Sequence, residues 1–241
     1  MKLPREISPC PIVQSIIELR LAPSPNVPAD AIFGLAYSRL RREFPSVANL
    51  PIANIPEQLR QSDPNLAYQP LHKFSKDNLS ISIGPRVIVF ACSPPYVGWE
   101  AFHREIRKAM EALLDIEGYV IKIERLGLRV VNIFDGPIAE SIIFNVTSSP
   151  LPLAESQFHS TFVYQEGEFK NTLQIGNNVD IVNEGKAAKA SILDIDTFKE
   201  DATGDILQNL WDLIDRAHSI EKRTFFSLLR PEKLERLNPV Y

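Results

Sequence analysis

Two arginines and an asparagine interrupt an apolar stretch, Glu124 to Gly136, which reads ERLGLRVVNIFDG. A guanidinium group can hold a phosphate or a carboxylate through two parallel hydrogen bonds. Arg125 and Arg129 share one face of the expected strand, because strand side chains alternate between faces. Gly127 lies between them and leaves room for another group to approach. The pattern predicts that both arginines bind an anionic partner, with Asn132 as a further contact.

The same residues have an alternative, structural role. Apolar residues occupy both faces of the stretch, which is typical of a central strand, and a buried guanidinium is costly unless it is paired. The expected strand from Pro11 to Ala22 offers a carboxylate, Glu18. If the two strands are neighbours, Glu18 pairs with Arg129 inside the protein. For Asn132 the alternative is a structural cap or a bulge.

Two aromatic residues open an expected helix in the segment YVGWE, Tyr96 to Glu100. Tyrosine and tryptophan are frequent anchors of protein interfaces, so Tyr96 and Trp99 are candidate partner contacts. Alternatively, Trp99 packs the first helical turn onto a sheet.

Asp194 and Asp196 form an Asp-x-Asp pair that could hold a divalent cation from one strand face. Asp196 could instead cap a turn. The four histidines lack metal-binding spacing, and the sequence has no phosphate-binding glycine motif and no GxSxG motif. We therefore expect no catalytic residue, no metal and no cofactor.

The composition is that of an ordinary globular protein: 241 residues, 44% hydrophobic and 23% charged. A net charge of -4 disfavours sequence-independent binding of nucleic acid, which needs a basic surface. Cys10 and Cys92 form neither a zinc motif nor a disulfide framework, so we expect a reducing cytoplasm. No apolar run approaches the length of a membrane helix.

Hydrophobic periodicity and the positions of proline and glycine predict the elements of the first half. These are a strand over 11–22, a helix from about 28 to 43, an irregular segment over 46–70, three short strands over 71–92 with turns at Asp77-Asn78 and Gly84-Pro85, and a helix from about 98 to 115.

The second half repeats this order. It comprises a strand over 119–134, a short helix over 137–146, a hairpin that turns at Glu166-Gly167, a strand over 187–198, and a long helix with Thr203 as its N-cap and Pro231 as its end. We expect an α+β fold in which two β-α-β-β-β-α-like halves, 1–118 and 119–241, form a mainly antiparallel sheet backed by helices. The halves could belong to one continuous domain, or be unrelated parts of one irregular α+β domain.

Several blocks resemble a sporadically distributed, uncharacterised family of bacterial and archaeal proteins. They are SPCPIVQSIIELRL, YVGWEAFHREI, RLGLRVVNIF, SILDIDTF and LWDLIDRAHSIEKRTFFSLL, in the order of that family. Family members usually have an aromatic residue after GLR, where this chain has Val130. The resemblance implies a cytoplasmic prokaryotic protein and no established reaction or ligand. The patchy distribution of the family is similar to that of mobile or defence-linked genes.

We expect a non-enzymatic binding or regulatory protein whose partner is another protein or a second copy of the chain, away from membranes. One alternative is a metal-dependent enzyme acting on nucleic acid or a nucleotide. It is favoured if Asp194 and Asp196 lie close to another acid or to Arg125 and Arg129. The other is a nucleic-acid-binding saddle, which requires basic residues to gather on an open sheet face.

Overall fold

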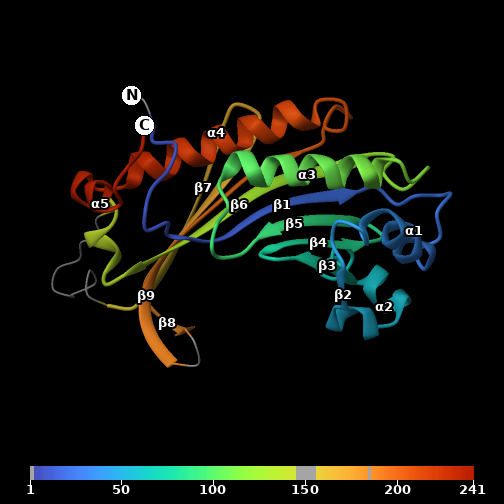
Figure 1. Ribbon diagram of the computed structural model, residues 1–241, viewed down its shortest axis with the longest axis horizontal. Helices are drawn as coiled ribbons and strands as arrows, with labels where there is room; N and C mark the ends of the chain where they lie inside the picture. Colours follow the sequence, from blue (N-terminus) through green and yellow to red (C-terminus); the bar gives the residue numbers. More distant parts are fainter. Residues whose placement is uncertain (1–2, 145–155, 184–185) are drawn as a thin grey trace. The chain divides into compact units, whose positions relative to one another are not determined.

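The computed structural model describes residues 3–144, 156–183 and 186–241. Nine strands lie in the described part: β1 (Ile12–Leu21), β2 (Ser46–Asn49), β3 (His72–Lys76), β4 (Leu79–Gly84), β5 (Val87–Cys92), β6 (Ile123–Asp135), β7 (Phe158–Glu166), β8 (Phe169–Asn183) and β9 (Lys186–Glu200). They form one antiparallel sheet in the order β2-β3-β4-β5-β1-β6-β9-β8-β7 (Figure 1).

The same residues contain five α-helices and two short 3-10 helices. They are α1 (Ala31–Leu40), α2 (Glu57–Ser62), α3 (Trp99–Leu114), α4 (Leu210–Leu228), α5 (Pro231–Arg236), η1 (Pro51–Asn54) and η2 (Ile138–Glu140). The predicted α+β class with an antiparallel sheet is therefore confirmed. In the part of the chain described, none of the helices has both the length and the apolar character needed to cross a bilayer.

The chain divides into two compact units, each discontinuous in sequence. Unit 1 comprises Met1–Ser15, Leu128–Phe198 and Asp215–Tyr241, and unit 2 comprises Ile16–Gly127 and Lys199–Ile214. Four elements, β1, β6, β9 and α4, have residues in both units. The predicted boundary between residues 118 and 119 stays a prediction.

The core of unit 2 includes the buried stripe of α3. Phe102, Ile106, Ala109, Met110 and Leu113 recur at helical spacing, and all five are buried. Figure 1 shows α3 running along the strands β1 and β5. Buried side chains of β3, β4 and β5 complete this core; they include Phe74, Ile81, Ile83 and Phe90.

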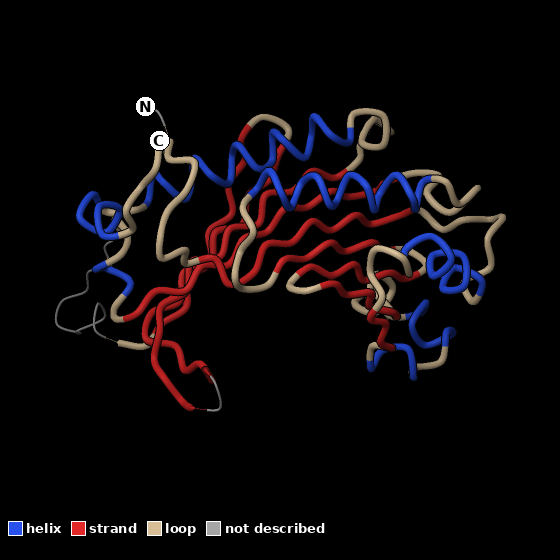
Figure 2. The backbone as a smooth tube through the Cα atoms, in the orientation of Figure 1, coloured by secondary structure: helices blue, strands red, loops and turns tan. Residues whose placement is uncertain are grey.

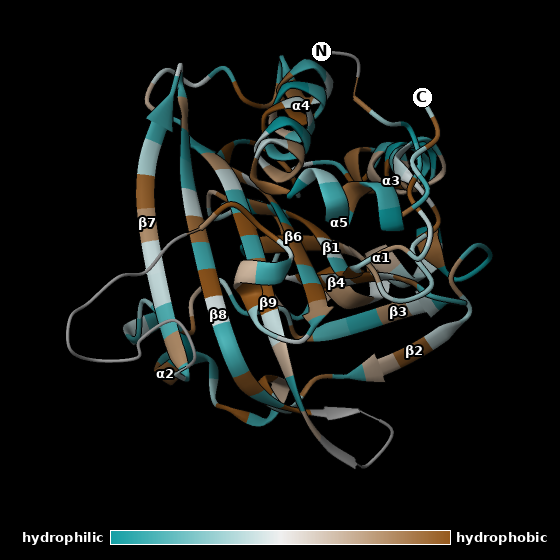
Figure 3. Cartoon of the chain, turned by 90° about the vertical axis from the view of Figure 1, so that its left-hand side faces the viewer, coloured by the Kyte–Doolittle hydropathy of each residue, from teal (hydrophilic) through white to brown (hydrophobic). Residues whose placement is uncertain are grey.

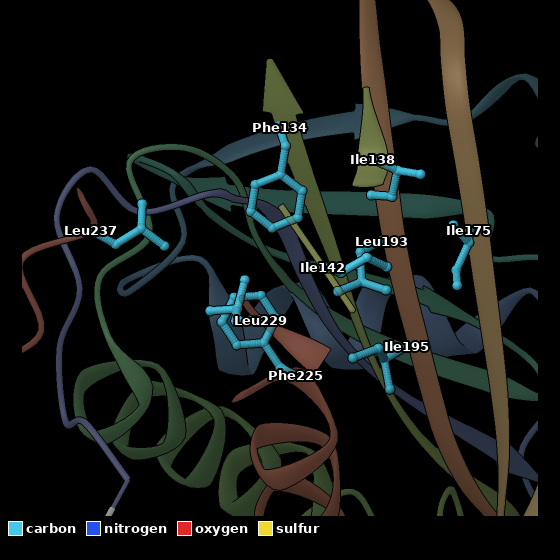
Figure 4. Packing of buried hydrophobic residues seen from close by; sticks show 9 residues of the cluster. All are labelled: Phe134, Ile138, Ile142, Ile175, Leu193, Ile195, Phe225, Leu229 and Leu237. Carbon is cyan, nitrogen blue, oxygen red and sulfur yellow. The ribbon is translucent and has the colours of Figure 1, made fainter. Parts of the chain in front are cut away.

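Unit 1 has its own apolar cluster, shown in Figure 4. Its members come from β6, β8, β9, the η2 region and the C-terminal helices: Phe134, Ile138, Ile142, Ile175, Leu193, Ile195, Phe225, Leu229 and Leu237. Burial of large apolar side chains stabilises a fold by about 1.5–3 kcal/mol each. This cluster therefore holds the strands of unit 1 against the end of α4.

Strand pairing confirms one predicted turn and moves two others by one residue. Lys76 pairs with Leu79 around Asp77-Asn78, as predicted, whereas Gly84 pairs with Val87 around Pro85-Arg86, one residue later than the predicted Gly84-Pro85. In the third, the hairpin turns at Gly167-Glu168, one residue later than predicted, because Glu166 still pairs with Phe169.

Other expectations were wrong in detail. Thr203 does not cap α4, which begins seven residues later, at Leu210. The Asp201 carboxylate instead accepts hydrogen bonds from the backbone N–H groups of Gly204 and Asp205, which stabilises a separate turn.

Pro231 is the first residue of α5. Within residues 137–144 the predicted short helix is only the 3-10 turn η2, and residues 145–146 of that prediction lie outside the described part. The segment over 46–70 contains β2, η1 and α2 (Figure 2).

Candidate functional site

Alternation along β6 separates its residues into two sets. Leu126, Leu128, Val130 and Phe134 are buried, together with Asn132. Arg125 and Arg129 belong to the other face, as predicted, but Arg125 is part of unit 2 and Arg129 is part of unit 1. Each arginine has a carboxylate partner within its own unit.

Arg125 donates a hydrogen bond of 2.9 Å from Nη1 to Oε1 of Glu18. The same oxygen accepts a bond of 2.8 Å from Nε of Arg20. The Arg125 side chain is only 14% exposed. The predicted pair between Glu18 and Arg129 is wrong, because the register of β1 and β6 brings Glu18 to Arg125. The contacts of Arg125 are therefore those of the structural alternative. A role of Arg125 in binding a partner stays a prediction.

The room predicted at Gly127 is present, and Arg125 fills it. A Cβ atom at Gly127 would lie 2.6 Å from Nη1 of Arg125. The glycine thus lets the guanidinium fold over the backbone of its own strand on its way to Glu18.

We expect Gly127→Ala to lower the free energy of unfolding by about 1–2 kcal/mol, because the new methyl group displaces a partly buried, charge-assisted hydrogen bond. Urea denaturation measures the change. Gly34→Ala in α1 is the control, since a Cβ there meets nothing within 4 Å. It should stabilise the protein by roughly 0.5–1 kcal/mol. Equal stability of Gly127→Ala and the wild type would contradict the role of the glycine.

Arg129 is held by two-point hydrogen bonding to Asp194. Its Nε lies 2.9 Å and 3.1 Å from the two carboxylate oxygens, and its Nη2 lies 2.5 Å from Oδ2. The Asp194 side chain is 6% exposed, whereas that of Arg129 is 45% exposed. The carboxylate therefore orients a guanidinium whose side chain is partly exposed to solvent.

This ion pair meets one of the conditions stated for the enzyme alternative, proximity of Asp194 to Arg129. However, both oxygens of Asp194 accept bonds from Arg129. Within residues 3–144, 156–183 and 186–241, no three His, Cys, Asp or Glu side chains are grouped so that they could hold a metal ion.

The predicted aromatic contacts lie around the first turns of α3 in unit 2. The Trp99 ring stacks on His103 at 5.3 Å between ring centroids, and His103 meets Trp211 edge-on at 5.7 Å. Tyr96 makes an edge contact with Phe102. Both predicted residues are half-buried. The cited contact of Trp99 is with a residue of its own helix, so its packing onto the sheet and the partner contacts of both residues stay predictions.

Asn132 is fully buried in unit 1, and its side-chain amide donates to the carbonyl oxygen of Leu193 at 3.3 Å. A partner could touch it only if the buried face of β6 opened. Its position supports the structural alternative.

Sequence reasoning missed a polar network in unit 2 around Tyr68. Nη2 of Arg86 donates to the Tyr68 hydroxyl at 2.6 Å and to Oε2 of Glu124 at 2.9 Å. The guanidinium groups of Arg20 and Arg86 lie 5.0 Å and 4.4 Å from the centre of the Tyr68 ring. Burial, followed by the hydrogen bond to Glu124, raises the pKa of Tyr68. Arg86 lies in the Pro85-Arg86 turn, and no motif in the sequence around it indicates this network.

Sequence reasoning also missed the exposure of β7 in unit 1. β7 is the last strand in the sheet order, and Phe162 and Val163 at its middle are 44% and 70% exposed. Figure 3 shows β7 outside β8, with an apolar band midway along the strand. A long edge strand with exposed apolar side chains is a ready template for another strand.

Comparison of the chain with protein-family models, with curated proteins and with solved structures finds no match. The function therefore has to be inferred from the geometry described above.

Proposed function

We propose that this chain is a cytoplasmic, non-enzymatic binding protein that pairs with an extended polypeptide strand along β7, and that this strand is the β7 of a second copy. The observation that carries the proposal is the exposed edge of β7, nine residues long with Val163 70% exposed. A partner strand supplies hydrogen bonds to the backbone and apolar contacts to the side chains.

The direction of the backbone groups supports strand addition. Glu166 and Phe169 flank a two-residue turn, so they form a hydrogen-bonded pair, and the even-numbered residues of β7 bond to β8. The odd-numbered residues, including Thr161 and Val163, then direct their N–H and C=O groups away from β8. These groups are the ones that a further antiparallel strand would bond.

The edge at the opposite end of the strand order differs from that of β7. β3 pairs with the short strand β2, from Ser46↔Ser75 to Asn49↔His72. That edge is only four residues long, and short edges are a common protection against unwanted pairing. β7 has no such additional strand in the described part of the chain.

The sequence of β7 suits pairing with itself. An antiparallel pair centred on Phe162 places the two Phe162 rings opposite each other and Thr161 opposite Val163 of the second copy. Aromatic and β-branched cross-strand pairs are favourable. His159 would face Gln165, so no like charges oppose each other. The one carboxylate of the strand, Glu166, forms an ion pair with Arg223 of α4.

Binding rather than catalysis is favoured by the use of Asp194. Both oxygens of Asp194 accept hydrogen bonds from Arg129, so this carboxylate serves to orient a guanidinium group. The resemblance to a family with a mobile or defence-linked distribution fits a regulatory role.

The proposal includes an internal pseudo-repeat of the halves 1–118 and 119–241. From the middle of the sheet outward, the strands run β1-β5-β4-β3 in the first half and β6-β9-β8-β7 in the second. The two halves also have a similar order of elements along the chain. In each, the first of these strands is followed by a helical segment, then by the other three strands and a long helix. In such a repeat β7 is the counterpart of β3, the strand that β2 covers.

Val163→Pro tests the strand addition. Proline removes an N–H group that points away from β8, so it should block pairing with a second copy and leave the β7–β8 ladder intact. Sedimentation velocity over about a hundredfold range of concentration should show a dimer for the wild type and a monomer for the variant.

Val163→Thr is the matched control, because threonine keeps the N–H group and favours strands. It should remain a dimer, and thermal unfolding should show that all three proteins are folded. A monomeric wild type, or a Val163→Pro variant that still dimerises, would overturn the proposal.

A further inference from the structure

Unit 2 contains a pocket of about 330 Å³, a size typical of small-molecule sites. It lies between the loop over 23–29, the helix α2, the segment over 66–69 and the Pro85-Arg86 turn. None of the residues singled out by sequence analysis as candidate contacts lines it. The pocket does not involve β7, so it is independent of the proposed strand pairing.

Two arginines line this pocket, and backbone carbonyl groups anchor both. Nε of Arg60 donates to the carbonyl oxygen of Ile55 at 2.9 Å, and Nε of Arg86 donates to that of Leu21 at 3.4 Å. Arg86 is further fixed by Tyr68 and Glu124. Both side chains are half-buried. Anchoring reduces the conformational entropy that each arginine would lose when it binds a ligand.

The anchored arginines retain hydrogen-bond donors. In the described residues, neither terminal nitrogen of Arg60 bonds an acceptor, and Nη1 of Arg86 also has none. Glu57 is the one acid among the lining residues, and its Oε1 accepts a bond from Gln61. Among the lining residues two guanidinium groups stand against the one carboxylate of Glu57, and Arg86 is also paired with Glu124 outside the lining.

Arg60 also acts on a neighbour outside the pocket lining. Burial, followed by the positive charge of Arg60, lowers the pKa of His72.

The remaining walls combine rigid apolar surface with polar side chains. Pro23, Pro25, Pro28 and Pro85 line the pocket together with Leu66, and Ser24, Asn26, Gln61 and Gln69 supply polar groups. Proline rings fix the backbone and offer apolar surface without donors. A matching ligand therefore carries an anionic head for the arginines and a compact body that packs against the proline rings.

We infer that this pocket binds a small organic phosphate monoester, with the phosphate between Arg60 and Arg86 and the organic part against the proline walls. A phosphate dianion offers several acceptor oxygens, which suits donors from two guanidinium groups.

Phenyl phosphate is a direct probe, because it combines a phosphate with a compact ring. Isothermal titration calorimetry should show saturable binding by the wild type. Arg60→Gln should weaken this binding about tenfold or more, since a charge-assisted contact is lost. The affinity of Arg60→Lys, which keeps the charge but not the forked donors of a guanidinium, should lie between those of the wild type and Arg60→Gln. Added salt should weaken binding by the wild type.

Arg104→Gln is the matched control, because Arg104 is an exposed arginine of α3 outside the pocket. It should bind like the wild type, and thermal unfolding should show that every variant is folded. Absence of saturable binding, or equal affinity of Arg60→Gln and the wild type, would overturn the site. Tighter binding of benzoate or of inorganic phosphate than of phenyl phosphate would overturn the ligand class.

Discussion

Glu221→Gln is expected to stabilise the protein strongly at pH 8 and hardly at pH 4.5. Glu221 lies on α4 with 5% of its surface exposed. Burial raises its pKa to about 8, against an ordinary value of 4.5, and the charge of Lys222 only partly opposes this shift. The side chain forms no hydrogen bond or ion pair within the described residues.

The direction of the pH dependence follows from proton binding. Between pH 4.5 and 8 the folded state keeps the proton of Glu221, whereas the unfolded state has lost it. Stability therefore falls as the pH rises through this range, by on the order of 3–5 kcal/mol in total. Glutamine is neutral at every pH, so the Glu221→Gln variant does not lose this stability as the pH rises.

Urea denaturation of Glu221→Gln and the wild type at several pH values between 4.5 and 8 measures the effect. The exposed Glu235 of α5 supplies the control, since Glu235→Gln should change stability by less than about 0.5 kcal/mol at each pH. A stability difference for Glu221→Gln that does not grow with pH would show that Glu221 is charged in the folded protein.

Arg129→Ala should destabilise unit 1, because it leaves the buried carboxylate of Asp194 without its counter-charge. Removal of one partner of a buried pair costs about 3–5 kcal/mol. Arg129 is 45% exposed, so solvent compensates for part of this loss, and we expect about 2 kcal/mol.

A double-mutant cycle isolates the interaction. Asp194→Ala in the Arg129→Ala background should cost less than it does alone, with a coupling of about 1 kcal/mol or more by chemical denaturation. Additive effects would mean that Arg129 does not hold Asp194. Arg104→Ala serves as the comparison for loss of an exposed arginine.

Sequence patterns were sufficient to predict the elements whose structure depends on interactions between neighbouring residues in the chain. The helix α3 spans Trp99–Leu114, close to the predicted 98–115, because its apolar stripe has the helical period. The turn at Asp77-Asn78 also depends on local chemistry: Asp77 adopts a positive φ of 52°, which Asp tolerates better than most residues.

The register between strands that are distant in the sequence could not be predicted in the same way. That Arg125 meets Glu18, and Arg129 meets Asp194, depends on how β6 is aligned with β1 and β9, and a strand pattern allows several alignments. The ATGD segment resembles a helix start at Thr203, but the Asp201 carboxylate takes the nearby N–H groups into a turn.

The pocket of unit 2 escaped prediction for a related reason. Arg60 and Arg86 are 26 residues apart in the sequence, on a helix and a turn that show no shared motif. The exposure of β7 was hidden as well, because alternation of side chains does not reveal which strand will lie at an edge.

The discontinuity of the two units has a consequence for synthesis on the ribosome. Residues 16–127 emerge early, but unit 2 also needs Lys199–Ile214. That segment carries Trp211, whose ring receives His103 edge-on and lies 4.4 Å from the guanidinium of Arg107. The nascent chain must therefore hold an incomplete unit 2 until residue 214 has left the exit tunnel, and over this interval chaperones would have an unfinished apolar surface to bind.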